Sequence, residues 1–263
     1  MTGSDHASAR PAFSVRESEP LARHLPCRVG GPCDAFIVVH DRDAILDVVS
    51  LCRSAGWNRT ILGAGTRTVV RDGGLAGAVI RLGSGFMSWS DTPTGAWVGA
   101  AIPLAVVGAR LAGCQRLLRA PGTLGASLKL DPLWYDVVSE VRYVDRGREK
   151  TGPLLEFQKQ RNAILCEAHL LRYDTPHNPG PFRPGGWFSP LVDEDVNEVL
   201  REAALADTRL RDVMIPAPQP ELLVNLGGAS AKDLALLQKS VIERVLSQRG
   251  VQLENAMHWL GRA

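Results

Sequence analysis

Two glycine-rich turns have residue types that could bind an anion. The first is 63–67 (GAGTR), which follows the short apolar run 60–62 (TIL), and the second is 121–125 (PGTLG). Glycines let successive backbone N–H groups face a ligand, and a threonine hydroxyl adds one more donor. The two turns could hold the diphosphate of a dinucleotide from both sides, or each could be a purely structural turn.

The first turn is not a Rossmann fingerprint. No third glycine opens a helix after residues 63–67, and the residues that follow resemble a strand. The turns alone therefore do not identify a ligand, and the rest of the sequence has to be considered.

Four sequence blocks, in this order along the chain, resemble the UDP-N-acetylenolpyruvoylglucosamine reductase (MurB) family. They are 24–32 (HLPCRVGGP), 62–74 (LGAGTRTVVRDGG), 121–126 (PGTLGA) and 223–234 (LVNLGGASAKDL), the last of these followed by 250–254 (GVQLE). The resemblance covers nearly all of residues 21–261. Members of this family reduce the enolpyruvyl ether of UDP-N-acetylglucosamine to UDP-N-acetylmuramate with FAD and NADPH, a step of peptidoglycan precursor synthesis in the cytoplasm.

The resemblance implies an α+β fold. A FAD-binding fold of two subdomains, of the PCMH/VAO type, is expected to precede a C-terminal α/β MurB-type substrate domain. FAD is expected to be bound non-covalently by the two turns. The residues that the resemblance carries over as cofactor-binding are Gly63, Ala64, Gly65, Thr66, Arg67, Pro121, Gly122, Thr123 and Gly125.

The side chains that carry out the family's reaction are missing at the matching positions. The proton-donating serine corresponds to Gly186, and Ser189 is a substitute only if it shifts by several residues. The glutamate that polarises the substrate corresponds to Ala256, whose methyl group cannot form a hydrogen bond. The arginine corresponds to Gln160 in strict register, or to Arg161 after a slip of one residue. Arg161 and Ser189 are therefore the remaining catalytic candidates.

Other replacements affect the expected ligand sites. Leu133 and Trp134 stand where the family has small residues, so we expect them to fill part of the flavin space. Arg67 replaces an asparagine and could still pair with a phosphate. Glu221 places a negative charge where a UDP phosphate would lie, which disfavours that ligand.

Three functional hypotheses follow. The first is a divergent MurB-like pseudoenzyme without the reductase activity, which acts as a nucleotide- or flavin-binding or regulatory protein. The second is an active FAD- and NADPH-dependent reductase of UDP-N-acetylglucosamine enolpyruvate, or of another enol ether or alkene. The third is a structural partner protein whose clefts are closed by Leu133 and Trp134.

The resemblance and the composition along the chain together imply five segments. We expect a disordered leader at 1–19, FAD-binding subdomains at 20–85 and 86–173, a linker rich in Pro and Gly at 174–186, and the C-terminal domain at 187–263. Within these segments the pattern predicts strands at 36–39, 60–62, 97–100, 137–144, 163–172, 222–225 and 251–260 and helices at 44–54, 104–112, 195–206 and 231–249. Ser230 and Gly250 are the expected start and stop of the last helix.

Composition narrows the classes of partner. The chain has 263 residues and a net charge of +2, with Lys and Arg scattered rather than clustered, so nucleic acid is not an expected partner. The five cysteines lack metal-ligand spacing, so no metal is predicted, and their odd number without a signal peptide fits reduced thiols in the cytoplasm. No apolar run is long enough to span a bilayer. The expected partners are FAD and possibly a UDP-sugar, with a protein partner left open.

Overall fold

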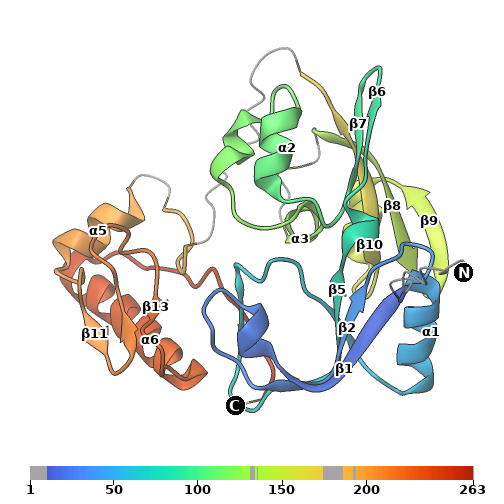
Figure 1. The fold of residues 1–263 in the computed structure, drawn as a ribbon. Coiled ribbons are helices and arrows are strands. Elements are labelled where there is room, and N and C mark those ends of the chain that lie inside the picture. Colours follow the sequence, from blue (N-terminus) through green and yellow to red (C-terminus); the bar gives the residue numbers. More distant parts are fainter. Residues whose placement is uncertain (1–10, 131–133, 135, 174–185, 192–193, 263) are drawn as a thin grey trace, which may run out of the picture.

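The computed structural model describes residues 11–130, 134, 136–173, 186–191 and 194–262. Two regions built around sheets contact each other, and a C-terminal region with its own helices lies on the left of Figure 1. Helices and separate sheets therefore combine in an α+β arrangement. Residues 1–10 of the leader expected at 1–19, and the greater part of the linker expected at 174–186, lie outside the described residues.

The first region is a four-stranded sheet in the order β1-β2-β5-β3. Strand β2 pairs antiparallel with β1 and parallel with β5, and β3 pairs parallel with β5. Helix α1 buries Ile45, Val48, Val49 and Cys52, which recur at helical spacing, against this sheet. The elements are β1 (Phe13–Pro20), η1 (Leu21–His24), β2 (Pro32–Val39), α1 (Ile45–Ser54), β3 (Arg59–Ile61), β4 (Thr68–Val70), β5 (Leu75–Leu82) and η2 (Ser84–Phe86).

Strand β1 corrects the expectation of a disordered leader. Residues 13–19 pair with β2 from Phe13 opposite Val39 to Glu19 opposite Cys33, so the prediction was wrong for this segment. Most side chains of β1 are exposed, and its sequence (FSVRESEP) is largely polar. Backbone pairing at the edge of an existing sheet does not require an apolar strand, and the hydrophobic pattern therefore gave no signal.

The second region is a five-stranded antiparallel sheet in the order β6-β7-β10-β8-β9. The short helices α2, α3 and α4 pack against it and share one apolar core with its strands. The elements are β6 (Trp89–Thr92), β7 (Gly95–Gly99), α2 (Leu104–Arg110), η3 (Gln115–Arg119), α3 (Leu124–Leu130), β8 (Val138–Asp145), β9 (Arg148–Gly152), α4 (Leu154–Lys159) and β10 (Ile164–Leu171).

The C-terminal region packs two helices against a small three-stranded sheet. Its elements are α5 (Val196–Glu202), β11 (Arg209–Leu210), β12 (Val213–Met214), β13 (Val224–Asn225) and α6 (Ala231–Arg249). Helix α6 begins with a capping box between Ser230 and Asp233 and ends at Gly250, whose φ is +67°. The predicted start and stop of this helix are therefore confirmed.

The last strand does not belong to the C-terminal region alone. Strand β14 (His258–Leu260) pairs in parallel with β4 of the first region, and the backbone N–H of Arg71 donates to the carbonyl of Leu260. The strand expected at 251–260 is thus only three residues long, and its partner strand belongs to the first region. The return of the chain places residues near 258 beside the first glycine-rich turn.

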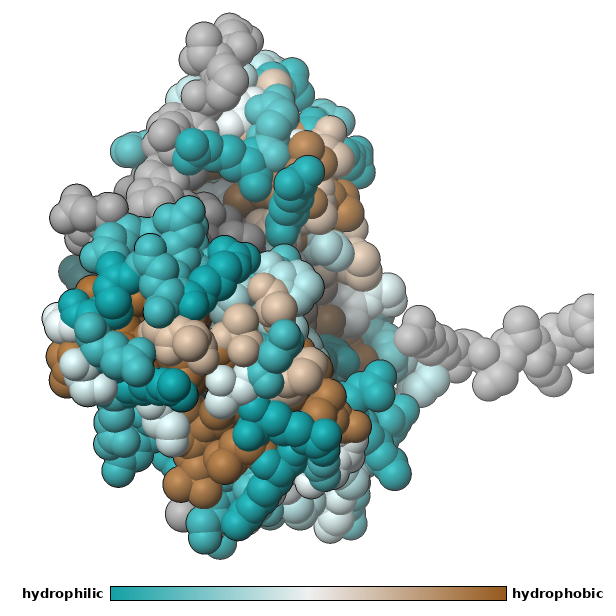
Figure 2. Space-filling view, turned by 90° about the vertical axis from the view of Figure 1, so that its left-hand side faces the viewer, coloured by the Kyte–Doolittle hydropathy of each residue, from teal (hydrophilic) through white to brown (hydrophobic). Residues whose placement is uncertain are grey.

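Within the described part of the chain, no helix has both the length and the apolar character needed to cross a membrane. Seen from the side of the C-terminal region, the surface mixes hydrophilic side chains with apolar areas (Figure 2).

Candidate active site

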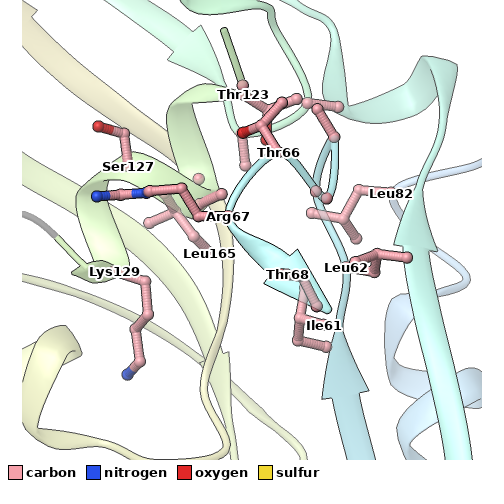
Figure 3. A pocket seen from close by; sticks show the side chains of 18 of the residues that line it. Ile61, Leu62, Thr66, Arg67, Thr68, Leu82, Thr123, Ser127, Lys129 and Leu165 are labelled. Carbon is pink, nitrogen blue, oxygen red and sulfur yellow. The ribbon is translucent and has the colours of Figure 1, made fainter. Parts of the chain in front are cut away.

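The two glycine-rich turns touch each other. A Cβ atom added to Gly63 would lie 2.6 Å from Oγ1 of Thr123 and 3.0 Å from Cβ of Ala126. A Cβ atom added to Gly122, whose φ is +111°, would lie 3.5 Å from Oγ1 of Thr66. Figure 3 shows the side chains of Thr66 and Thr123 next to each other, one from each turn. The absence of a side chain at Gly63 is therefore what allows the turns to approach this closely.

A cavity of about 450 Å³ lies between the turns. All nine residues predicted to bind a cofactor line it: Gly63, Ala64, Gly65, Thr66, Arg67, Pro121, Gly122, Thr123 and Gly125. Four basic side chains also line it, namely Arg67, Arg81, Lys129 and His258, and its described lining includes no aspartate or glutamate. The cavity combines backbone N–H groups, hydroxyl groups and positive charge, which suits a large anionic ligand. We call it the first cavity.

The basic residues of the first cavity are held in different ways. The Arg81 guanidinium donates to the carbonyl of His24 over 3.1 Å, and burial lowers its pKa. Lys129 donates to the carbonyls of Phe157, Gln158 and Gln160 at the end of α4, and burial lowers its pKa as well. Burial, with a contribution from Arg67, lowers the pKa of His258.

The space of the first cavity is not closed by Trp134. The indole Nε1 of Trp134 donates to Oγ of Ser127 over 2.8 Å, and the ring is buried in the core of the second region. The described lining of the first cavity does not include Trp134, so the structure does not place this ring in the space where the resemblance led us to expect it. Leu133, the other residue of that prediction, lies outside the described residues.

A second cavity of about 740 Å³ lies between the first two regions and the C-terminal region. Gly65, Thr66, Thr68 and Pro121 line both cavities, so they share a wall. The charged residues that line the second cavity are Arg28 and Arg119 from the first half of the chain and Asp195 and Glu221 from the C-terminal region. A ligand in this cavity would lie next to a ligand in the first.

Asn225 also lines the second cavity, and its side chain forms hydrogen bonds with both sides of that cavity. Its Nδ2 donates to the carbonyls of Cys27 and Arg28, over 3.2 and 3.3 Å. Its Oδ1 accepts from the backbone N–H groups of Gly227 and Ala229, over 2.8 and 3.1 Å. The asparagine of the fourth sequence block therefore connects the C-terminal region to the first block.

The positions of the missing serine and glutamate come together in space. Phe188 and Asn255 form an antiparallel bridge, and the backbone N–H of Ala256 donates to the carbonyl of Trp187 over 3.1 Å. Gly186 therefore lies on a segment paired with the segment of Ala256. A Cβ atom added to Gly186 would lie 3.1 Å from Oε2 of Glu221, a residue of the second cavity.

The two remaining catalytic candidates lie elsewhere. Arg161 is exposed beyond the end of α4, and Ser189 donates its backbone N–H to the carbonyl of Glu254. The described linings of the two cavities include neither of them. The positively charged side chain at this end of α4 is instead Lys129. The sequence did not predict Lys129 as a site residue, because the carbonyl groups that it contacts belong to a helix distant in the sequence. In the described part of the chain, no cluster of three or more His, Cys, Asp or Glu side chains could hold a metal ion.

Comparisons with known proteins agree with this architecture. Residues 177–260 match the family model for the C-terminal domain of UDP-N-acetylenolpyruvoylglucosamine reductase. The UDP-N-acetylenolpyruvoylglucosamine reductase of Rubrobacter xylanophilus is 28% identical, over 94% of this chain and 96% of the relative. That of Gluconobacter oxydans is also 28% identical, over 100% of this chain and 97% of the relative.

A solved structure shares the fold over nearly the whole chain. The crystal structure of UDP-N-acetylenolpyruvylglucosamine reductase (MurB) from Thermus caldophilus aligns with a TM-score of 0.71, at 23% identity, over 95% of this chain and 99% of that one. The family model, the full-length relatives and the shared fold agree with the four sequence blocks. The chain is similar to UDP-N-acetylenolpyruvoylglucosamine reductases over nearly its whole length, and its C-terminal part matches the C-terminal domain of that family.

Proposed function

We propose that the protein binds FAD in the first cavity and uses it to reduce a substrate held in the second. The observation that carries this proposal is the shared wall at Gly65, Thr66, Thr68 and Pro121. A redox cofactor and its substrate must lie next to each other for electrons to pass between them. Two cavities that share four residues meet this requirement.

The first cavity fits the chemistry of FAD. The touching turns leave no room for a side chain at Gly63, and the φ of +111° at Gly122 favours glycine, so the backbone of both turns can approach a diphosphate closely. The hydroxyls of Thr66 and Thr123 and the guanidinium of Arg67 would add donors to the same group. When bound, FAD supplies a hydride that it has accepted from a reduced nicotinamide.

UDP-N-acetylglucosamine enolpyruvate is the first substrate to test, with NADPH as the reductant. The relatives are named as reductases of this compound, and the second cavity, at about 740 Å³, is of the size that a small organic ligand requires. In this role the protein would serve peptidoglycan precursor synthesis in the cytoplasm.

A second candidate function is flavin or nucleotide binding without reduction of this substrate. It is favoured by Gly186 and Ala256, which lie on paired segments beside the second cavity and have no side-chain group that could donate or accept a proton. In this case the protein would act as a binding or regulatory relative of the reductase.

One set of measurements separates these functions. The full-length protein would be reconstituted with FAD, freed of unbound cofactor and examined for the visible absorption band of flavin. Bound flavin together with NADPH oxidation that depends on UDP-N-acetylglucosamine enolpyruvate is the result expected for a reductase. Bound flavin without that dependence indicates the second candidate, and protein that retains no flavin contradicts the reductase and the flavin-binding form of the second candidate.

A further inference from the structure

His258 places an imidazole ring at the wall of the first cavity. It is the first residue of β14, and its side chain is exposed and lines the cavity. Its backbone N–H donates to the carbonyl of Arg67 over 2.8 Å, and it stands opposite Thr68 in the parallel pairing of β14 with β4. Thr68 lines both cavities. A fixed backbone therefore holds the ring of His258 beside a ligand of the first cavity, close to the wall that the two cavities share.

Among the described residues that line the first cavity, His258 is the one whose side chain ordinarily changes its charge close to neutral pH. The ordinary pKa of its imidazole is 6.5. The other charged side chains are those of Arg67, Arg81 and Lys129, and arginine and lysine ordinarily titrate far above neutral pH. The described lining contains no aspartate, glutamate, cysteine or tyrosine. His258 is therefore the group that would respond to a change in the charge of the ligand.

The protein environment opposes a positive charge on His258. Burial and the positive charge of Arg67 lower the pKa of His258. Arg81 from β5 and Lys129 from α3 bring two more positive charges to the same cavity, while β4 (TVV) contributes no charged side chain. No carboxylate of the described lining counteracts them. The imidazole is therefore neutral at neutral pH unless a ligand supplies a negative charge beside it.

Reduction of a flavin supplies such a charge. The ring system of an oxidised flavin is neutral, and a hydride that adds to it leaves one negative charge on the ring. A nearby negative charge favours the protonated form of a histidine and raises its pKa. The effect is reciprocal, because a protonated histidine favours the reduced flavin by the same free energy.

We propose that His258 takes up a proton when FAD in the first cavity is reduced, so that each electron pair is accompanied by two protons around neutral pH. One proton enters the flavin as part of the hydride, and the other binds to a ring nitrogen of His258. When the hydride passes to a carbon of the substrate, the imidazolium releases its proton, which balances the proton that the neighbouring carbon takes up. This inference rests on the proposed function, because it takes FAD as the ligand of the first cavity.

The test measures how the midpoint potential of the bound flavin depends on pH. The full-length protein, reconstituted with FAD, would be equilibrated with redox dyes at a series of pH values on both sides of neutral. For a two-electron couple, a tenfold change in proton concentration shifts the potential by about 30 mV for each proton taken up. The wild-type slope around neutral pH is therefore expected to be steeper than that of His258→Gln by about 30 mV per pH unit.

Two further variants separate proton uptake from other effects. His258→Lys carries a permanent positive charge, so it is expected to have the shallow slope of His258→Gln but a higher potential. His169→Gln removes a histidine that forms hydrogen bonds with Ser139 and Thr92 and that belongs to neither described cavity lining. This control is expected to keep the wild-type slope.

A second measurement follows the imidazole itself. The NMR signal of the His258 ring, assigned from its absence in His258→Gln, would be titrated in the oxidised and the reduced wild-type protein. Its titration midpoint is expected to rise on reduction. This result decides the question even where a variant fails to retain flavin.

Equal slopes in flavin-loaded wild type and His258→Gln, or a titration midpoint of His258 that stays the same on reduction, would overturn this inference and leave the proposed function intact. Wild-type protein that retains no flavin contradicts the proposed function, and this inference with it. The flavin band of each sample shows which of the two has failed.

Discussion

The carboxylate of Asp72, in the first half of the chain, accepts a hydrogen bond of 2.8 Å from the backbone N–H of Ala231, the first residue of α6. Its second oxygen accepts from the N–H of Lys232 over 3.2 Å. A negative charge at a helix N-terminus is favourable, and here it comes from another region of the fold. Asp72 follows the glycine-rich turn at 63–67 in the sequence. It thus fixes the C-terminal region close to that turn.

Replacing Asp72 should loosen this connection. Asp72→Ala leaves two N–H groups of α6 without their acceptor, and we expect it to lower the free energy of unfolding by about 1–2 kcal/mol. Urea unfolding followed by circular dichroism measures this value. Glu17→Ala, which removes an exposed carboxylate on β1, should change it by less than about 0.5 kcal/mol. An Asp72→Ala protein as stable as the wild type would show that the cap contributes nothing.

Asn225 should be sensitive even to an isosteric change. Asn225→Asp keeps the acceptor for Gly227 and Ala229 but brings a carboxylate against the carbonyls of Cys27 and Arg28. We expect a loss of about 1–3 kcal/mol in the free energy of unfolding. The matched control is Asn162→Asp, at an exposed position. Equal losses in the two variants would contradict the bridging role of Asn225.

The contact between the turns predicts an effect on cofactor binding. Gly63→Ala would force the side chains of Thr123 and Ala126 away from the first turn. Overpacking of this kind costs about 1–3 kcal/mol, so FAD affinity should fall by roughly tenfold to a hundredfold. The ratio of flavin absorbance to protein at a series of FAD concentrations measures the affinity. Gly152→Ala is the control, because its Cβ would meet only the flexible end of Glu156; unchanged affinity in Gly63→Ala would refute the role of the contact.

The edge strand β1 carries a pH-dependent contribution to stability. The hydrogen bond from Nε2 of His24 to Oε1 of Glu19, 2.9 Å long, lowers the pKa of Glu19 below its ordinary value of 4.5. A carboxyl group with a lowered pKa in the folded state stabilises the protein above its ordinary pKa, and the contribution is lost as the pH falls through the folded-state value. Glu19→Gln should therefore lower the melting temperature near neutral pH, with the difference shrinking under acid conditions. A difference that stays constant with pH would contradict this assignment.

The sequence allowed the parts of the fold with strong local signals to be predicted. The turn at 63–67 and the cap at Ser230 depend on glycine conformation and on a side-chain oxygen beside a helix start, which are local properties. His24, which opens the first sequence block, forms a hydrogen bond to Glu19 five residues earlier in the chain. These features are decided within a few residues of the chain or within one sequence block.

The features that could not be predicted depend on distant partners. Strand β14 is three residues long and exists because β4 offers a free edge, which no local pattern reveals. The packing of Trp134 could not be predicted from side-chain size, because its hydrogen bond to Ser127 forms only once the ring is buried in the core of the second region. The approach of Glu221 to Gly186 joins two segments that are remote in sequence, so the loss of one side chain and the gain of another could not be related before the fold was known.

The pairing of β14 with β4 also sets an order of events during synthesis. His258 and Leu260 line the first cavity together with the glycine-rich turn at 63–67. The ribosome synthesises that turn much earlier than it synthesises residues 258–260. The nascent first half therefore emerges with one wall of this cavity missing and with the free edge of β4 exposed to other strands. A ligand can meet the finished first cavity only after residues 258–260 have left the ribosomal tunnel, so its uptake is expected to follow translation rather than accompany it.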